Sequence, residues 1–131
     1  MTDNILLLDL GGTNLRVGYG NKDQKSVKKI SKQKIHANEE LKKIIQEIVE
    51  GSNATEIVMS VAGPKRENKI TMTNRNLVLD EIELKKNTKT DNFYLLNDWE
   101  SIGYCLPLLQ DEDFKTVKKG VSNPEKTCLA I

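Results

Sequence analysis

The chain has 131 residues, of which 20 are Lys or Arg and 19 are Asp or Glu, so its formal net charge is +1. A charge this close to zero creates no field that attracts nucleic acid or an anionic membrane, and we expect neither partner. No apolar stretch approaches the length of a membrane span, and the first residues lack the basic region of a secretion signal. The two cysteines, Cys105 and Cys128, lack the spacing of a zinc site, and a reducing cytoplasm is the expected location.

Three strands are predicted before the first helix. The apolar run 5–10 is typical of a strand buried on both faces, and residues 15–19 alternate like a second strand after a glycine turn. Residues 26–35 carry several lysines, which favours an edge strand. A helix is expected between Asn38, as its N-cap, and Gly51, because the apolar residues between them follow helical spacing.

Shorter elements are predicted in the second half of the chain. Residues 56–61 and 69–72 are expected to form strands, and residues 80–86, whose apolar period is ambiguous, a short helix. Residues 93–96 predict another buried strand. The helix after that strand is expected to kink or end at Pro107.

The helix that begins near Asp98 has an apolar stripe. Trp99, Ile102 and Leu106 share this stripe, so Trp99 is expected in a core, and Cys105 is expected to be a small buried side chain. Beyond the helix, we predict a polar loop followed by the start of a strand at residues 127–131.

This order of elements predicts an α/β fold. A three-stranded meander followed by strand–helix crossovers gives a mixed sheet, and we expect helices on both of its faces. A doubly wound dinucleotide-binding domain alternates strands and helices from its start, so three strands before the first helix argue against it.

The segment from Asp9 to Arg16 begins at the end of the first strand and contains the first candidate site. Without Cβ atoms, Gly11 and Gly12 allow backbone N–H groups to approach a phosphate, and the Thr13 hydroxyl adds a donor. A carboxylate such as Asp9 beside a phosphate calls for a cation between them, and Mg²⁺ is the natural one. The alternative is an ordinary tight hairpin.

The second candidate site is the pair Asn97 and Asp98, at the junction of a strand and a helix. A carboxylate there can accept a proton from a sugar hydroxyl, and a neighbouring amide can hydrogen-bond adjacent hydroxyls. The alternative is that Asp98 only caps the helix and Asn97 is a turn residue.

The third candidate site combines Gly63, in a turn of small residues, with Thr73 and Asn74 after a short strand. The alternative is a turn and a strand that only line the core.

These motifs resemble those of the bacterial glucokinases, within the actin-like, ribonuclease H-like kinases. The segment Asp9-Leu10-Gly11-Gly12-Thr13-Asn14-Leu15-Arg16 resembles the first phosphate motif of that superfamily, and Asn97-Asp98-Trp99 is similar to the Asn-Asp-aromatic motif of glucokinases. The stretch Met72-Thr73-Asn74 is similar to another of their motifs. Family members more often have Phe and Thr where this chain has Trp99 and Glu100, a difference expected to affect packing.

The resemblance implies an ATP-dependent kinase that phosphorylates a hexose, with glucose as the expected substrate. Asp98 would be the catalytic base, and the sugar would be bound by Asn97, Asp98, Gly63, Thr73 and Asn74. The nucleotide would be bound by Asp9, Gly11, Gly12, Thr13, Asn14 and Arg16, with Asp9 positioning Mg²⁺ through water.

The resemblance covers only the front of the family. Residues 1–110 are expected to form the N-terminal domain, and residues 111–131 to lead into a large domain that the sequence lacks. We therefore expect a fragment that is inactive alone and that either self-associates through an apolar face left exposed or is only marginally stable. The alternative functions are a non-catalytic sugar-binding or regulatory half-kinase and an actin-like ATPase, which the adjacent Asn97 and Asp98 disfavour.

Overall fold

The computed structural model describes residues 5–121, 123 and 125. The strand predicted at 127–131 and Cys128 lie outside these residues. The chain divides into two compact units, Met1–Asp98 and Trp99–Ile131. The boundary expected at residue 110, between an N-terminal domain and a segment that leads into a large domain, stays a prediction.

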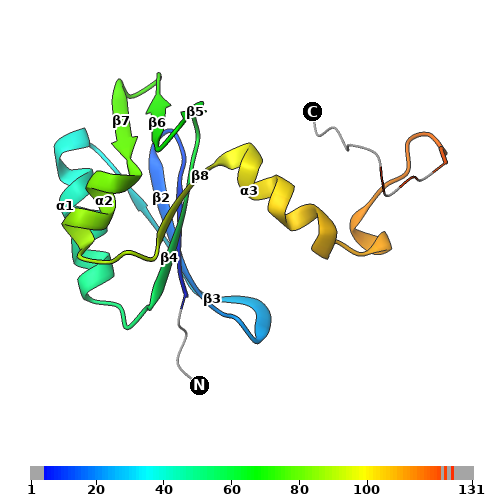
Figure 1. The fold of residues 1–131 in the computed structure, drawn as a ribbon, viewed down its shortest axis with the longest axis horizontal. Helices are drawn as coiled ribbons and strands as arrows, with labels where there is room; N and C mark the ends of the chain where they lie inside the picture. The colour runs from blue at the N-terminus through cyan, green and yellow to red at the C-terminus, as the bar shows by residue number, and fades with distance from the viewer. Residues whose placement is uncertain (1–4, 122, 124, 126–131) are drawn as a thin grey trace. The chain divides into compact units, whose positions relative to one another are not determined.

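The first unit contains a five-stranded mixed sheet in the order β3-β2-β1-β4-β8 (Figure 1). Strand β1 pairs antiparallel with β2 and parallel with β4, and β8 pairs parallel with β4. The predicted meander, edge strand and crossovers are confirmed. The strands are β1 (Ile5–Leu10), β2 (Asn14–Asn21), β3 (Gln24–Lys34), β4 (Glu56–Val61) and β8 (Phe93–Asn97).

A second sheet with the order β5-β6-β7 lies in the connection between β4 and the next helix (Figure 1). Its strands are β5 (Lys65–Arg66), β6 (Lys69–Met72) and β7 (Leu77–Asp80). Only β6 was predicted. Two residues are too few to show a period in the sequence, so β5 leaves no signal there.

Helices α1 (Asn38–Glu50) and α2 (Glu81–Thr88) contact each other and lie together on one side of the main sheet (Figure 1). The predicted Gly51 C-cap is confirmed, but the N-cap is Ala37 and not Asn38. The Asn38 side chain is engaged elsewhere, because its Nδ2 donates to the Arg75 carbonyl oxygen at 2.7 Å.

The core lies between these helices and the sheet. Leu41 and Ile45 of α1 are fully buried, as are Leu6 and Leu10 of β1 and Phe93 of β8. In β1, in β4 and in β8 up to Leu95, buried side chains alternate with less buried ones, as expected for a sheet with one face in the core.

The other face of the sheet is not covered by either helix of the first unit. Its rows include Ile5, Leu7 and Val58, which are half-buried, and Tyr94, which is 45% exposed. A helix on this face and self-association of the chain both stay predictions.

The second unit begins with most of helix α3 (Asp98–Cys105). The helix ends before Pro107, as predicted, and two short 3-10 turns follow at Leu106–Leu108 and Asp111–Asp113. The predicted burial of Trp99 and Cys105 is wrong, because Trp99 is 53% exposed and Cys105 is also exposed. None of the described residues of this unit is buried, so the apolar stripe has no core to enter. Within the described part of the chain, no helix is long and apolar enough to cross a membrane.

Candidate functional site

The strands that precede the candidate sites have their carboxyl ends at the same end of the main sheet. Leu10, Val61 and Asn97, the last residues of β1, β4 and β8, stand in a single row across the sheet. Adjacent strands are about 4.8 Å apart, so the backbones of Leu10 and Asn97 are separated by roughly 10 Å. The glycine loop after β1 and the residue Asp98 after β8 therefore start from the same end.

The two carboxylates of the candidate site lie next to the row of Leu10, Val61 and Asn97, since Asp9 precedes Leu10 and Asp98 follows Asn97. Asp9 stands in one row with Ser60 and Leu96, on the face opposite to Leu10. Asp98 is the first residue of helix α3, so strand alternation does not assign it to a face of the sheet. Neither is sealed in apolar packing, because the Asp9 side chain is 46% exposed and Asp98 is half-buried.

The glycine loop is a tight turn between β1 and β2. The Gly11 N–H donates to the Asn14 carbonyl oxygen at 3.0 Å, and Asn14 Nδ2 donates to Thr13 Oγ1 at 2.8 Å. The Thr13 side chain is exposed, while its carbonyl oxygen accepts from the Ile35 N–H at 2.9 Å. Both ends of the loop are thus anchored, and Thr13 faces solvent.

Gly12 is required for close approach rather than for backbone conformation. None of the described glycines has a positive φ. A Cβ atom at Gly12 would instead lie 2.8 Å from Nδ2 of Asn74. The structure therefore brings the glycine loop together with the turn that contains Thr73 and Asn74.

Asp9 forms an ion pair with Arg16, in which Arg16 donates to Asp9 Oδ2 at 2.7 Å. Both side chains are about half exposed, so the pair is open to solvent. The described residues contain no group of three or more His, Cys, Asp or Glu side chains that could hold a metal. A cation at Asp9 would therefore take most of its oxygen ligands from water and phosphate, which is the usual coordination of Mg²⁺ in phosphoryl-transfer sites.

Gly63 lies in the turn after β4 and packs against β6. A Cβ atom at Gly63 would lie 2.4 Å from the Thr71 carbonyl oxygen, and the Thr71 N–H donates to the Pro64 carbonyl oxygen at 3.2 Å. The turn is also joined to β1, because the Ala62 N–H donates to the Leu10 carbonyl oxygen at 3.1 Å.

Sequence reasoning missed Arg75, which links the Thr73–Asn74 turn to the glycine loop. An Arg75 guanidinium nitrogen donates to the Ile35 carbonyl oxygen at 2.8 Å, and the Ile35 N–H in turn donates to Thr13. The other terminal nitrogen, Nη1, is buried and has no hydrogen-bond partner. Its position next to Asn74 in the sequence was the only available signal.

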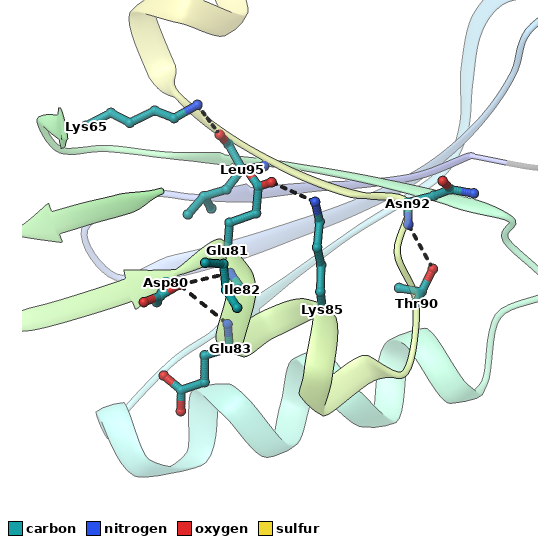
Figure 2. A network of polar contacts seen from close by, with 9 residues as sticks. All are labelled: Lys65, Asp80, Glu81, Ile82, Glu83, Lys85, Thr90, Asn92 and Leu95. Carbon is teal, nitrogen blue, oxygen red and sulfur yellow. Dashed lines mark hydrogen bonds and ion pairs between the residues drawn. The ribbon is translucent and has the colours of Figure 1, made fainter. Parts of the chain in front are cut away.

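Sequence reasoning also missed a polar network along the free edge of β8 (Figure 2). Glu81 of α2 accepts from the Leu95 N–H at 3.1 Å, and Lys65 of β5 donates to the Leu95 carbonyl oxygen at 2.7 Å. Lys85 forms an ion pair with Glu81 at 2.9 Å. Burial alone would raise the pKa of Glu81, but the hydrogen bonds from Lys85 and Leu95 outweigh it, and the pKa is lowered.

Comparison with known proteins gives a consistent family. The family model for glucokinase matches residues 6–131. The chain is 26% identical over 128 residues to a glucokinase of Cronobacter sakazakii, covering 96% of this chain and 40% of that protein. It is also 26% identical over 127 residues to a glucokinase of Nostoc punctiforme, covering 92% of this chain and 37% of that protein.

Solved structures of sugar kinases share the fold. A glucokinase from an Antarctic psychrotroph has a TM-score of 0.71 at 19% identity, covering 95% of this chain and 41% of that chain. A ROK hexokinase from Thermus thermophilus has a TM-score of 0.58 at 23% identity, covering 72% of this chain and 35% of that chain. The fold is thus that of the actin-like, ribonuclease H-like kinases. With its family-model match over residues 6–131, the chain belongs to the glucokinase family, and it spans about 40% of the length of the relatives it matches.

Proposed function

We propose that the complete protein transfers a phosphoryl group from ATP to a hexose, with the 6-hydroxyl of glucose as acceptor, and that this chain supplies the front part of the site. The observation that carries the proposal is the single row formed by Leu10, Val61 and Asn97. The glycine loop, the Gly63 turn and Asp98 each follow one residue of this row, so all three begin at the same end of the sheet. A shared nucleotide and sugar site requires this.

The sugar side of the proposed site consists of Asp98 with its neighbours. Asp98 is half-buried at the end of β8, where its carboxylate accepts the proton of the hydroxyl that attacks the phosphorus. Asn97 hydrogen-bonds adjacent hydroxyls through its amide, which both donates and accepts. Gly63, Thr73 and Asn74 complete this side, and the contact of Asn74 with the glycine loop joins the two sides.

The phosphate side consists of the glycine loop and the Asp9–Arg16 pair. The Gly12 N–H and the Asn14 amide are presented to the phosphates, and Gly11 adds space because it lacks a Cβ atom, while its own N–H closes the turn onto Asn14. The exposed Thr13 hydroxyl adds a donor, and the Arg16 guanidinium supplies positive charge. The half-exposed Asp9 carboxylate fits a Mg²⁺ ion held through water. When bound, Mg²⁺ neutralises the charge that develops on the transferred group, while the loop keeps that group in line with the sugar.

The 131 residues alone are expected to lack turnover. Phosphoryl transfer depends on positioning, and this chain spans 40% of the length of the Cronobacter sakazakii glucokinase that it matches. A coupled assay on the isolated chain tests this. Glucose binding is measured separately. An isolated chain that binds glucose but does not phosphorylate it would favour a sugar-binding half-kinase over a fragment that can neither bind nor phosphorylate glucose by itself.

The proposed function is tested by Asp98→Asn in the complete protein. The variant keeps the size of the side chain but removes the base, so kcat should fall by about 10²- to 10⁴-fold while the affinity for glucose is largely kept. Asp91→Asn, an exposed position before β8, is the matched control and should leave kcat unchanged. Turnover by Asp98→Asn at the rate of this control would show that Asp98 is not the base.

A further inference from the structure

Strand β8, which ends at the proposed base, is an edge strand of the main sheet. It pairs with β4 alone, and Leu95 stands opposite Met59 in that pairing. Both backbone polar groups of Leu95 are bound by side chains, the N–H by Glu81 and the carbonyl by Lys65 (Figure 2). Charged side chains from α2 and β5 therefore take the place of a further strand.

We propose that Lys65 and Glu81 are positioning residues that hold β8, and with it Asn97 and Asp98, in the register needed for phosphoryl transfer. This inference rests on the proposed function. Neither residue touches the reacting groups in the proposed mechanism, and both act through the backbone of Leu95.

The position of Leu95 explains why side-chain contacts to its backbone can fix the register of β8. Leu95 precedes Asp98 by three residues, or about 10 Å of extended strand. A slip of one residue in the pairing of β8 would turn the side chains of the strand, that of Asn97 included, to the opposite face of the sheet and would displace Asp98 with them. An edge strand pairs with a neighbouring strand on one side only. Contacts on its other side therefore help to fix its register.

Lys65 also joins β8 to the sugar-side turn. It follows Gly63 by two residues, and its ammonium group reaches Leu95, thirty positions further along the chain. The distance between the Gly63 turn and Asp98 therefore depends on this one hydrogen bond as well as on the sheet. Holding two parts of a site at a fixed separation is the kind of contribution that orientation makes to catalysis.

Glu81 is itself held in place. Its ion pair with Lys85 fixes the carboxylate from within α2, and the Glu81 and Lys85 side chains are 19% and 32% exposed. The Glu81 N–H donates to the Asn68 carbonyl oxygen at 2.8 Å, which fixes the start of the helix. Charge-assisted hydrogen bonds with little solvent access are stronger than neutral ones.

The test uses Glu81→Met and Lys65→Met in the complete protein. Each variant removes one contact to Leu95 and keeps a long side chain, and we expect kcat to fall about 10- to 100-fold with little change in KM for glucose. Glu81→Gln, whose amide oxygen can still accept from Leu95, should restore most of the rate. Glu83→Met is the matched control, because Glu83 is an exposed residue of the same helix that pairs with Lys42 and not with β8.

Amide hydrogen exchange at Leu95 is a second readout that does not depend on activity. The exchange rate of this N–H should rise in Glu81→Met and stay near the wild-type rate in Glu81→Gln and Glu83→Met. If Glu81→Met does not fold, Lys65→Met and Glu81→Gln still give both measurements.

The outcomes separate this inference from the proposed function. If Asp98→Asn abolishes turnover but Glu81→Met and Lys65→Met behave like Glu83→Met, the positioning role is overturned and the proposed function stands. If Asp98→Asn keeps normal turnover, Asp98 is not the base, and the positioning role that acts through β8 on Asp98 fails with it, whatever the exchange at Leu95 shows.

Discussion

Gly12 and Asn74 lie so close that a Cβ atom on Gly12 would approach Asn74 Nδ2 to 2.8 Å. Real Cβ atoms are not found this close to a neighbour, so one of the two groups must move in Gly12→Ala. Asn74 is exposed and its amide is the end of a short flexible side chain. We therefore expect the side chain of Asn74 to rotate away, rather than the fold to break.

Gly12→Ala in the complete protein should thus change the free energy of unfolding by less than about 0.5 kcal/mol, as for other surface substitutions. The KM values for ATP and glucose should rise, because Asn74 leaves its place between the two sides of the site. Gly11→Ala is the control, since its Cβ would make only an ordinary contact with Asn14. In an Asn74→Ala background, Gly12→Ala should have no further effect on KM for glucose. If Gly11→Ala raised the KM values as much as Gly12→Ala, the effect would come from hindered approach of the phosphates and not from the displacement of Asn74.

Gly63→Ala is expected to act on stability instead. The atom that its Cβ would meet at 2.4 Å is the Thr71 carbonyl oxygen, which belongs to the backbone of β6 and cannot rotate away. Overpacking of this kind typically costs about 1–3 kcal/mol in the free energy of unfolding. Urea unfolding measures the cost, with Gly103→Ala as the control because a Cβ there meets nothing within 4 Å. A Gly63→Ala variant as stable as the control would mean that the turn after β4 can shift freely.

The main sheet could be predicted because its central strands have a strong sequence signal. Strands β1, β4 and β8 are short apolar runs that end near turn-forming or polar residues. The apolar residues of helix α1 recur with a clear helical period. The sequence could not show whether the apolar stripe around Trp99 faces a core or solvent. The spacing of apolar residues shows which of them share one face of a helix, but not what covers that face.

The places of Asp9, at the end of β1, and of Asp98, directly after β8, could be predicted from the sequence, while their roles stay predictions. The contacts that support the site were not predictable. Lys65 and Arg75 bind backbone carbonyls that lie 30 and 40 positions away in the sequence. Every residue has a backbone carbonyl, so the acceptor of such a bond leaves no mark on the residue type, and only the fold brings donor and acceptor together.

Arg75→Met should loosen the link between the Thr73–Asn74 turn and the glycine loop. It removes the donor to the partly buried Ile35 carbonyl, so the free energy of unfolding should fall by about 1 kcal/mol. The KM for ATP should also rise, because Ile35 anchors Thr13 through its N–H. Arg66→Met, at an exposed position of β5, is the matched control for loss of charge. An unchanged KM for ATP in Arg75→Met would show that the anchor at Thr13 holds without Arg75.

Acid is expected to destabilise the first unit through the start of α2. Burial alone would raise the pKa of Asp80, but the N–H groups of Ile82 and Glu83 and the ammonium of Lys69 outweigh it, and the pKa is lowered. Asp80 Oδ1 accepts from the Ile82 N–H at 2.9 Å, which makes Asp80 the N-cap of the helix. The pKa of Glu81 is lowered by its contacts with Lys85 and Leu95.

The direction of the pH effect follows from these lowered pKa values. The folded chain binds fewer protons than the unfolded chain, whose Asp and Glu pKa values are about 3.9 and 4.3. The stabilisation is therefore complete above those values and is lost as pH falls through the lower pKa values of the folded state. Urea unfolding between about pH 6 and pH 3 should show a smaller acid loss in Asp80→Asn and in Glu81→Gln than in the control Glu83→Gln. Equal losses in all three variants would place the acid-sensitive contacts elsewhere in the fold.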